Sequence, residues 1–114
     1  MVYRVVISDR VSEQLDNYVQ YLVVKLGNAQ AGSNLLEDAL DTAEALSYVA
    51  GSLPFCVDPD LRQRGIRKML FTRHRYLWLY QINGDTVQVM GMYHELQDYE
   101  NIFRSEEFRS PAIS

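Results

Sequence analysis

The basic side chains of this sequence are concentrated in one segment, where their charge could serve chemistry on an anion. Residues 61–84 contain six of the eleven lysines and arginines and no acid, so the segment has a formal charge of +6 and the remainder −10. The six are Arg62, Arg64, Arg67, Lys68, Arg73 and Arg75. Aromatic residues lie among them, and cations interleaved with aromatic rings suit a polyanion or an acidic peptide.

Two histidines add groups that can transfer protons near neutral pH. Metal-independent cleavage of RNA needs a base for the 2′-hydroxyl, cations for the charge at phosphorus and an acid for the leaving oxygen. His74 and His94 can transfer the protons, the cations can hold phosphate, and an aromatic ring such as Tyr93 can stack on a base. The residue types of an endoribonuclease are therefore present.

The same residues also have ordinary structural interpretations. Tyr76, Trp78 and Tyr80 alternate along one predicted strand, which is typical of a sheet core. His94 at a strand end is compatible with a purely structural hydrogen bond, and His74 between two arginines with an exposed loop. The arginines themselves can be solvated surface charges.

Composition excludes several classes of site. Cys56 is the single cysteine, so an internal disulfide framework is excluded, and we expect a buried small side chain there. No residues have the spacing of metal ligands and no glycine-rich phosphate loop is present, so neither a metal nor a cofactor is expected. The sequence shows neither a signal peptide nor an apolar run of about 18 residues, which predicts a cytoplasmic protein without a membrane contact.

The first half of the chain predicts a strand followed by two antiparallel helices. Val2–Ile7 alternates as a strand, and Ser8 can cap the helix that follows. Apolar residues then recur at helical spacing as far as Leu26, and Gly27 can end this helix. A second helix is expected over Asn28–Ala50. The acids of its expected exposed face are Glu37, Asp38, Asp41 and Glu44.

The second half predicts an antiparallel meander of three strands. The strands are expected at Ile66–Thr72, Tyr76–Ile82 and Thr86–Tyr93. Pro59 keeps the preceding linker extended, and Asn83–Gly84 is a strong signal for a tight hairpin turn. A short helix over Gln97–Phe108 can close the domain.

Alternation along the last strand would place Val87, Val89 and Tyr93 on one face and His94 on the other. The order β-α-α-β-β-β-α predicts an α+β fold, with the helical hairpin packed on one face of a small, mostly antiparallel sheet. A single domain is expected over residues 1–109, followed by a disordered tail at residues 110–114.

Several short motifs occur in a characteristic order along this predicted fold. They are Leu61-Arg62…Gly65-Ile66-Arg67, Tyr76-x-x-x-Tyr80, Asn83-Gly84-Asp85 and His94-x-x-Gln97-Asp98. With the helical hairpin, they resemble the RelE/ParE superfamily, the toxins of bacterial type II toxin–antitoxin pairs, over residues 2 to about 103. The resemblance implies a cognate antitoxin whose extended or helical tail wraps the toxin. RelE-like members cleave messenger RNA in the ribosome, whereas ParE-like members inhibit DNA gyrase and are not nucleases.

A RelE-like nuclease would assign chemical roles to eight residues of this chain. The catalytic residues would be Arg67, Arg75, Tyr93 and His94. The residues that hold the substrate would be Arg62, Arg64, Lys68 and Arg73. Two departures favour a ParE-like member instead. Leu77 stands where RelE-like nucleases usually carry an arginine, and Glu95 follows His94 where a catalytic tyrosine is often found.

Three functions stay open at this point: a ribosome-dependent nuclease, a gyrase inhibitor that contacts its target through Gln97–Arg109, and a low-toxicity relative that only binds an antitoxin. The basic segment favours the nuclease by a small margin. In each case we expect a partner strand or helix on the sheet edge or along the helical hairpin, with its acidic residues against the basic segment. A homodimer and a toxin–antitoxin hetero-oligomer are both compatible with this expectation.

Overall fold

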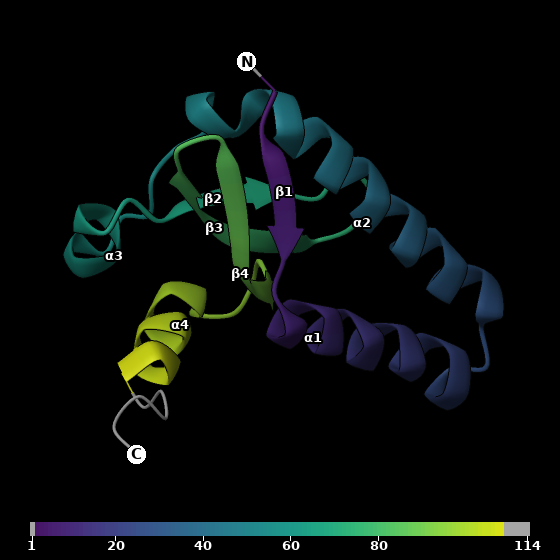
Figure 1. Ribbon diagram of the computed structural model, residues 1–114. Coiled ribbons are helices and arrows are strands. Elements are labelled where there is room, and N and C mark those ends of the chain that lie inside the picture. Colours follow the sequence, from purple (N-terminus) through teal and green to yellow (C-terminus); the bar gives the residue numbers. More distant parts are fainter. Residues whose placement is uncertain (1, 109–114) are drawn as a thin grey trace.

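The computed structural model describes residues 2–108 and confirms the predicted order of elements, with one short helix added. The elements are β1 (Arg4–Ile7), α1 (Asp9–Gln20), α2 (Ala29–Val49), α3 (Pro59–Gln63), β2 (Arg67–Leu70), β3 (Tyr76–Asn83), β4 (Thr86–His94) and α4 (Tyr99–Phe108) (Figure 1). A π-helical segment, Tyr21–Lys25, extends α1, and a 3₁₀ turn, Ala50–Ser52, follows α2. The tail expected at residues 110–114 lies outside the described residues.

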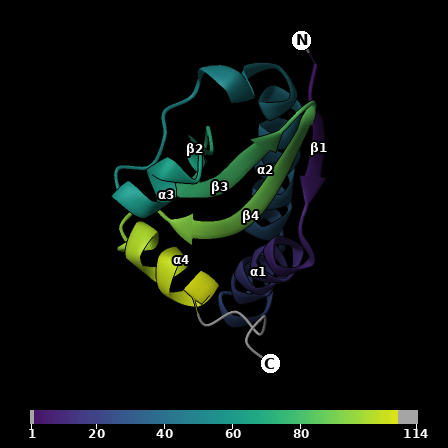
Figure 2. The ribbon, with the colours of Figure 1, turned by 60° about the vertical axis from the view of Figure 1, so that its left-hand side comes forward.

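The strands form one sheet in the order β1-β4-β3-β2. β1 runs parallel to β4, and the two other pairings are antiparallel, so the sheet is mostly antiparallel as predicted. α1 and α2 lie as a hairpin against one face of the sheet, and α4 lies against the other (Figure 1, Figure 2). The architecture is therefore the expected α+β fold.

Local signals set the bounds of the helical hairpin. The Ser8 hydroxyl accepts a hydrogen bond from the Val11 amide at 3.2 Å, and the Asn28 side chain accepts one from the Ala31 amide at 2.9 Å. Between the two helices Gly27 has a φ of 62°, a conformation that favours glycine. The cap predicted at Ser8 and the helix end predicted at Gly27 are thereby confirmed. Within residues 2–108, no helix is both long enough and apolar enough to cross a membrane.

The core consists of two layers, one on each face of the sheet. The hairpin layer lies under α1 and α2 and includes Val11, Leu35, Leu46, Trp78, Tyr80, Val87, Val89 and Met92. The α4 layer lies on the opposite face and contains Cys56, Leu61, Ile66, Leu77, Leu79, Tyr93 and Phe103. The alternation predicted for β3 is confirmed, because Trp78 and Tyr80 belong to the first layer and Leu77 and Leu79 to the second.

The alternation predicted for β4 is wrong beyond Val89. Leu79 pairs with Gly91 and Tyr80 pairs with Val89, so Met90 is an extra residue opposite the Leu79–Tyr80 step. Such a bulge reverses which residues point to each face of the sheet. Tyr93 therefore lies in the α4 layer, on the face opposite to Val87 and Val89.

The expectation that Pro59 keeps the linker extended is also wrong, because Pro59 begins the short helix α3. Proline suits the first helical position, where its missing N–H would have no helical partner. Asp58 caps this helix, and its carboxylate accepts hydrogen bonds from the amides of Asp60 at 2.9 Å and Leu61 at 3.2 Å. The fully buried Leu61 fixes α3 to the α4 layer.

Candidate functional site

The basic residues of β2 point in different directions and already have partners. The Arg67 guanidinium donates to the Leu53 carbonyl at 2.6 Å and stacks on the Phe55 ring, 3.9 Å from its centroid. Lys68 reaches the other way, to the Tyr99 hydroxyl at 2.9 Å and the Glu100 carboxylate at 3.6 Å. Two neighbouring cations therefore do not form one phosphate site.

The other basic residues of the segment also lie apart from one another. Arg73 pairs with Asp41 of α2 at 2.8 Å, and Arg75 pairs with Glu95 at 3.2 Å. Arg62 lies 5.7 Å from the Phe55 ring, and Arg64 is exposed at the end of α3. The segment itself contains no acid, but acids from other parts of the chain form salt bridges with its cations.

Tyr93 is sealed beneath α4. Its hydroxyl donates to the Glu106 carboxylate at 2.7 Å and accepts from the Arg10 guanidinium at 2.8 Å, and the residue is 3% exposed. Burial, and then the hydrogen bond to Glu106, raise the pKa of Tyr93 well above its ordinary value. The phenol is therefore held protonated and cannot act as a base at neutral pH.

His94 lies on the other face of the sheet from Tyr93. Its ring packs edge-on against Tyr76, with the centroids 5.4 Å apart, and its Nδ1 accepts a hydrogen bond from the Leu96 amide at 3.1 Å. The structural hydrogen bond that we considered for His94 is thus present. Of the residues proposed for catalysis, Tyr93 and His94 are separated by the sheet, and Arg67 and Arg75 have partners of their own.

The prediction that Asp38 is exposed is wrong, and His74 lies in the loop between β2 and β3 as expected but is only partly exposed. Asp38 is fully buried, and its Oδ2 accepts hydrogen bonds from the Arg73 amide at 2.9 Å and from His74 Nδ1 at 2.7 Å. Its Oδ1 has no hydrogen-bond partner, and the Arg73 guanidinium lies 4.0 Å away. This carboxylate fastens α2 to the turn between β2 and β3.

The balance of forces on Asp38 keeps it ionised. Burial would raise the pKa of this carboxyl, but the hydrogen bonds from His74 and from the Arg73 amide outweigh burial, so the pKa is lowered. A signal for this burial exists in the sequence. Asp38 lies three residues after Leu35 and four before Thr42, and both of these are buried on α2.

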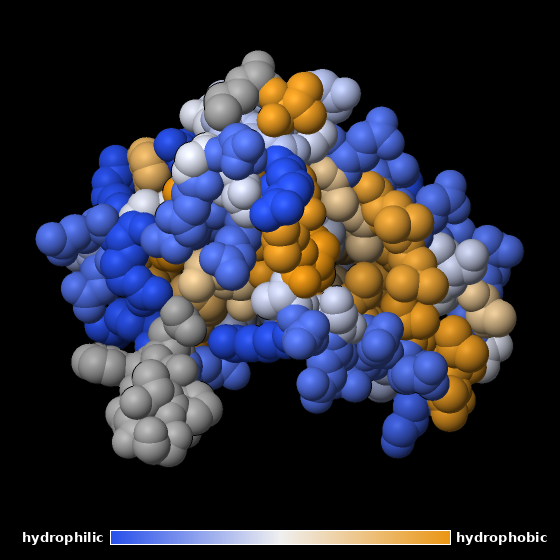
Figure 3. Space-filling view, viewed as in Figure 1, coloured by the Kyte–Doolittle hydropathy of each residue, from blue (hydrophilic) through white to orange (hydrophobic). Residues whose placement is uncertain are grey.

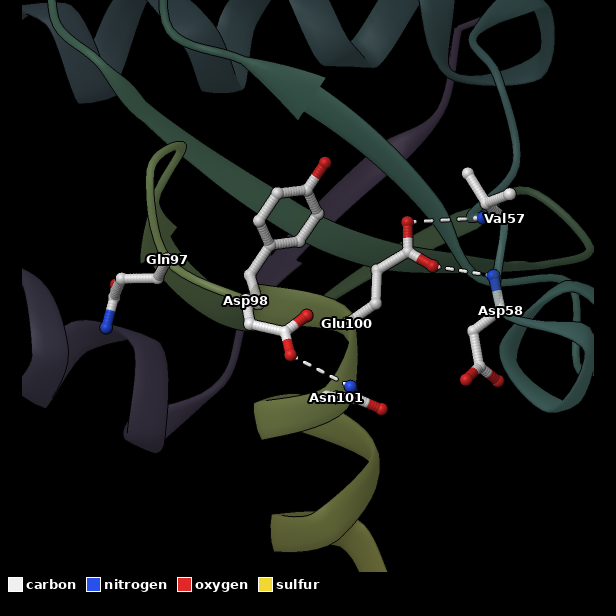
Figure 4. A pocket seen from close by; sticks show the side chains of 7 residues that line it. Val57, Asp58, Gln97, Asp98, Glu100 and Asn101 are labelled. Atoms are coloured by element: carbon white, nitrogen blue, oxygen red, sulfur yellow. Dashed lines mark hydrogen bonds between the residues drawn. The ribbon is translucent and has the colours of Figure 1, made fainter.

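A pocket of about 400 Å³ lies between the start of α4 and the residues before α3 (Figure 4). The Glu100 side chain points across it and accepts hydrogen bonds from the amides of Val57 at 3.2 Å and Asp58 at 2.7 Å. Asp98 accepts a hydrogen bond from the Asn101 side chain at 2.8 Å. Glu100 thus binds backbone amides next to α3, and Asp98 binds a side chain in the first turn of α4. The residues that line the pocket therefore hold α3 and α4 together.

An apolar groove of about 290 Å³ lies between α1 and α2. Its lining residues are Ile7, Ser12, Leu15, Leu36, Ala39, Leu40, Ala43 and Trp78. Leu36 is 42% and Leu40 71% exposed, and Figure 3 shows a hydrophobic band over α2 between hydrophilic margins. A partner was expected on the sheet edge or along the helical hairpin, but this groove was not predicted. The signal was Leu36 and Leu40, two large apolar residues four apart beside the buried stripe of α2.

Comparisons with known proteins support the fold. No protein-family model matches the chain, and no curated protein matches it. Among solved structures, the chain is similar to one described as the chromosomal ParDE TA system from P. aeruginosa, with a TM-score of 0.66 and 16% sequence identity. The match covers 82% of this chain and 96% of that chain. At this identity the likeness establishes the shared fold of helices on a four-stranded, mostly antiparallel sheet.

Proposed function

We propose that this chain is the toxin-type component of a toxin–antitoxin pair and that it acts by binding a protein rather than by cleaving RNA. The fold likeness to a ParDE TA system and the RelE/ParE motifs support the first part. One observation carries the second part: the groups expected to cleave RNA are engaged elsewhere, whereas the apolar groove between α1 and α2 lies open.

The geometry disfavours RNA cleavage for a chemical reason. A base, an acid and several cations must reach one phosphate within hydrogen-bonding distance. Here Tyr93 is covered by α4, His94 lies on the other face, and Arg67 is held by the Leu53 carbonyl. Leu77 is 1% exposed within the α4 layer, so the position where a nuclease would carry arginine belongs to the core.

DNA gyrase is the target that we propose, because the departures from RelE-like nucleases at Leu77 and Glu95 favour a ParE-like protein. Two assays on the same preparation separate the mechanisms. We expect induced expression to arrest growth, saturating protein to inhibit gyrase supercoiling, and primer extension to show no cleavage at translated codons.

Variants of the supposed nuclease residues provide the control. We expect the variants His94→Gln and Arg75→Ala to arrest growth as the wild type does, because neither residue lines the groove between α1 and α2. Cleavage of translated messenger RNA that is lost in His94→Gln would contradict the proposal and restore the nuclease. Supercoiling that is unaffected at saturating protein would remove gyrase as the target.

A further inference from the structure

We propose that the groove between α1 and α2 receives an amphipathic helix whose apolar residues are flanked by lysine or arginine. This inference rests on the proposed function and specifies the chemistry of the binding partner. It differs from the expectation that acidic residues of a partner meet the basic segment of this chain.

The floor of the groove suits a helix that packs lengthwise. Ala39 and Ala43, four residues apart on α2, are small and leave a shallow channel beside the ridge of Leu36 and Leu40. Trp78 closes the channel from the sheet. Apolar side chains at helical spacing on a partner would fit this channel, which is how amphipathic helices bind grooves. The lining from Leu36 to Ala43 spans roughly 10 Å, about two helical turns.

The margins of the groove are acidic. Asp9 and Asp16 on α1 lie three residues before and four residues after Ser12, which lines the groove, so they share its side of the helix. Glu44 lies four residues after Leu40 on α2 and is exposed. Salt bridges in the described part of the chain reach none of these three acids. A partner with basic flanks would complement them.

The same charges argue against a second copy of this chain as the occupant. Two copies that met through this groove would bring their acidic margins together, and like charges in contact are unfavourable. Lys68, Arg73 and Arg75 of a second copy would not provide the basic flanks of such a helix, because they lie outside helices and pair with Glu100, Asp41 and Glu95.

Synthetic peptides test the proposal on the full-length protein. The probe is a helical peptide of about 14 residues, or four turns, with leucines along one face and lysines beside them, and the matched control carries glutamates in place of the lysines. Binding is followed by anisotropy of the labelled peptide and by emission of Trp78, the single tryptophan. We expect the lysine peptide to bind roughly tenfold more tightly than the glutamate peptide and to weaken as salt rises.

Matched variants locate the site. Leu40→Lys should weaken the lysine peptide by roughly tenfold, since it places a charge on the apolar ridge. Leu96→Lys changes an equally large, 74% exposed leucine outside the groove and should bind as the wild type does. Combined Asp16→Lys and Glu44→Lys should reverse the preference, so that the glutamate peptide binds better. Circular dichroism confirms that each variant is folded.

Three results would overturn the inference. They are equal binding of the two peptides, unchanged binding by Leu40→Lys, and a wild-type dimer that Leu40→Lys converts to a monomer in sedimentation. The last result would assign the groove to a second copy. Because peptide binding is measured without growth or gyrase, loss of the proposed function would appear as absent toxicity and absent supercoiling inhibition, with peptide binding intact.

Discussion

The carboxylate of Asp38 occupies the most demanding position of any single side chain in residues 2–108. It is fully buried and charged, and one of its two oxygens has no hydrogen-bond partner. A charge taken out of water is costly unless hydrogen bonds and opposite charge surround it. The Arg73 amide, the His74 ring and the more distant Arg73 guanidinium provide them, so this residue makes the packing of α2 dependent on the β2–β3 turn.

Replacement of Asp38 by alanine should therefore lower the free energy of unfolding by about 1–3 kcal/mol, because the Arg73 amide and the His74 ring lose their acceptor. Urea denaturation measures this change. Asp41→Ala is the matched control, since Asp41 also pairs with Arg73 but is exposed, and its loss should cost about 0–1 kcal/mol. Equal effects of the two replacements would contradict the role assigned to the buried carboxylate.

The contribution of Asp38 should also depend on pH. The pKa of its carboxyl is lowered from the ordinary 3.8, so the folded state binds fewer protons than the unfolded state. The stabilisation is complete above the unfolded value and is lost as the pH falls through the folded value. The difference in unfolding free energy between wild type and Asp38→Ala should be constant near neutrality and shrink in acid. A constant difference at every pH would contradict the assignment.

At the scale of elements, α4 is fastened to the rest of the fold by side chains at both ends. Glu100 in its first turn accepts hydrogen bonds from the amides of Val57 and Asp58, and Glu106 in its later part meets Arg10 and Tyr93. Phe103 fills the space between them. α4 thus covers Tyr93 and closes the α4 layer against solvent.

Glu100→Ala should loosen α4, because two backbone amides and Lys68 lose a carboxylate that is largely buried. We expect a loss of about 1.5–3 kcal/mol in unfolding free energy and faster amide hydrogen exchange in α4. Glu95→Ala removes the partner of the exposed Arg75 and should leave exchange in α4 unchanged. Unaltered exchange in Glu100→Ala would contradict this role of Glu100 and leave Phe103 and Glu106 as the contacts that hold the helix.

Cys56 lies in the same α4 layer, and the reactivity of its thiol tests whether this layer is closed to solvent. Burial first, and then the nearby charge of Glu100, raise the pKa of its thiol to about 12. The raised pKa keeps the thiol protonated, and a fully buried thiol is out of reach of reagents. We expect no reaction with a disulfide reagent at mildly alkaline pH until the protein unfolds. Rapid reaction of the native protein would contradict the closed α4 layer.

For the whole molecule, the distribution of charge in space differs from that in the sequence. Three of the six cations of the acid-free segment, Lys68, Arg73 and Arg75, pair with Glu100, Asp41 and Glu95, each far from its partner along the chain. The net charge of −4 is then expressed mainly on the helical hairpin, whose exposed acids include Asp9, Asp16 and Glu44. A general affinity for nucleic acid does not fit such a surface.

The protein should accordingly retain little affinity for RNA at physiological salt. We expect a Kd weaker than about 10⁻⁴ M for a single-stranded RNA, because few phosphates can be neutralised together. Fluorescence anisotropy against a salt series measures it. The double replacement Arg62→Ala with Arg67→Ala removes both cations around Phe55 and tests a place where two cations and a ring gather. Tight binding that this pair of replacements abolishes would contradict the expectation.

Features that depend on neighbouring residues could be predicted from the sequence, and features that depend on distant ones could not. Ser8 and Asn28 cap helices through amides three residues away, and Trp78 follows the alternation of its own strand. The pairing of Lys68 with Glu100 and that of Asp38 with His74 join residues more than thirty positions apart, and the register set by Met90 is a property of two strands together. Local patterns carry no information on such partners.

The extra residue in β4 affects how roles can be transferred between relatives of this fold. Val89 and Tyr93, four positions apart, lie on opposite faces of the sheet only because Met90 is an extra residue. If a relative lacks this residue and is aligned without a gap there, the residue written against Tyr93 would face the helical hairpin, and the residue written against His94 would face α4. An alignment that matches letters across this point can therefore exchange a surface residue for a core residue, and functional residues of β4 should be matched by strand pairing.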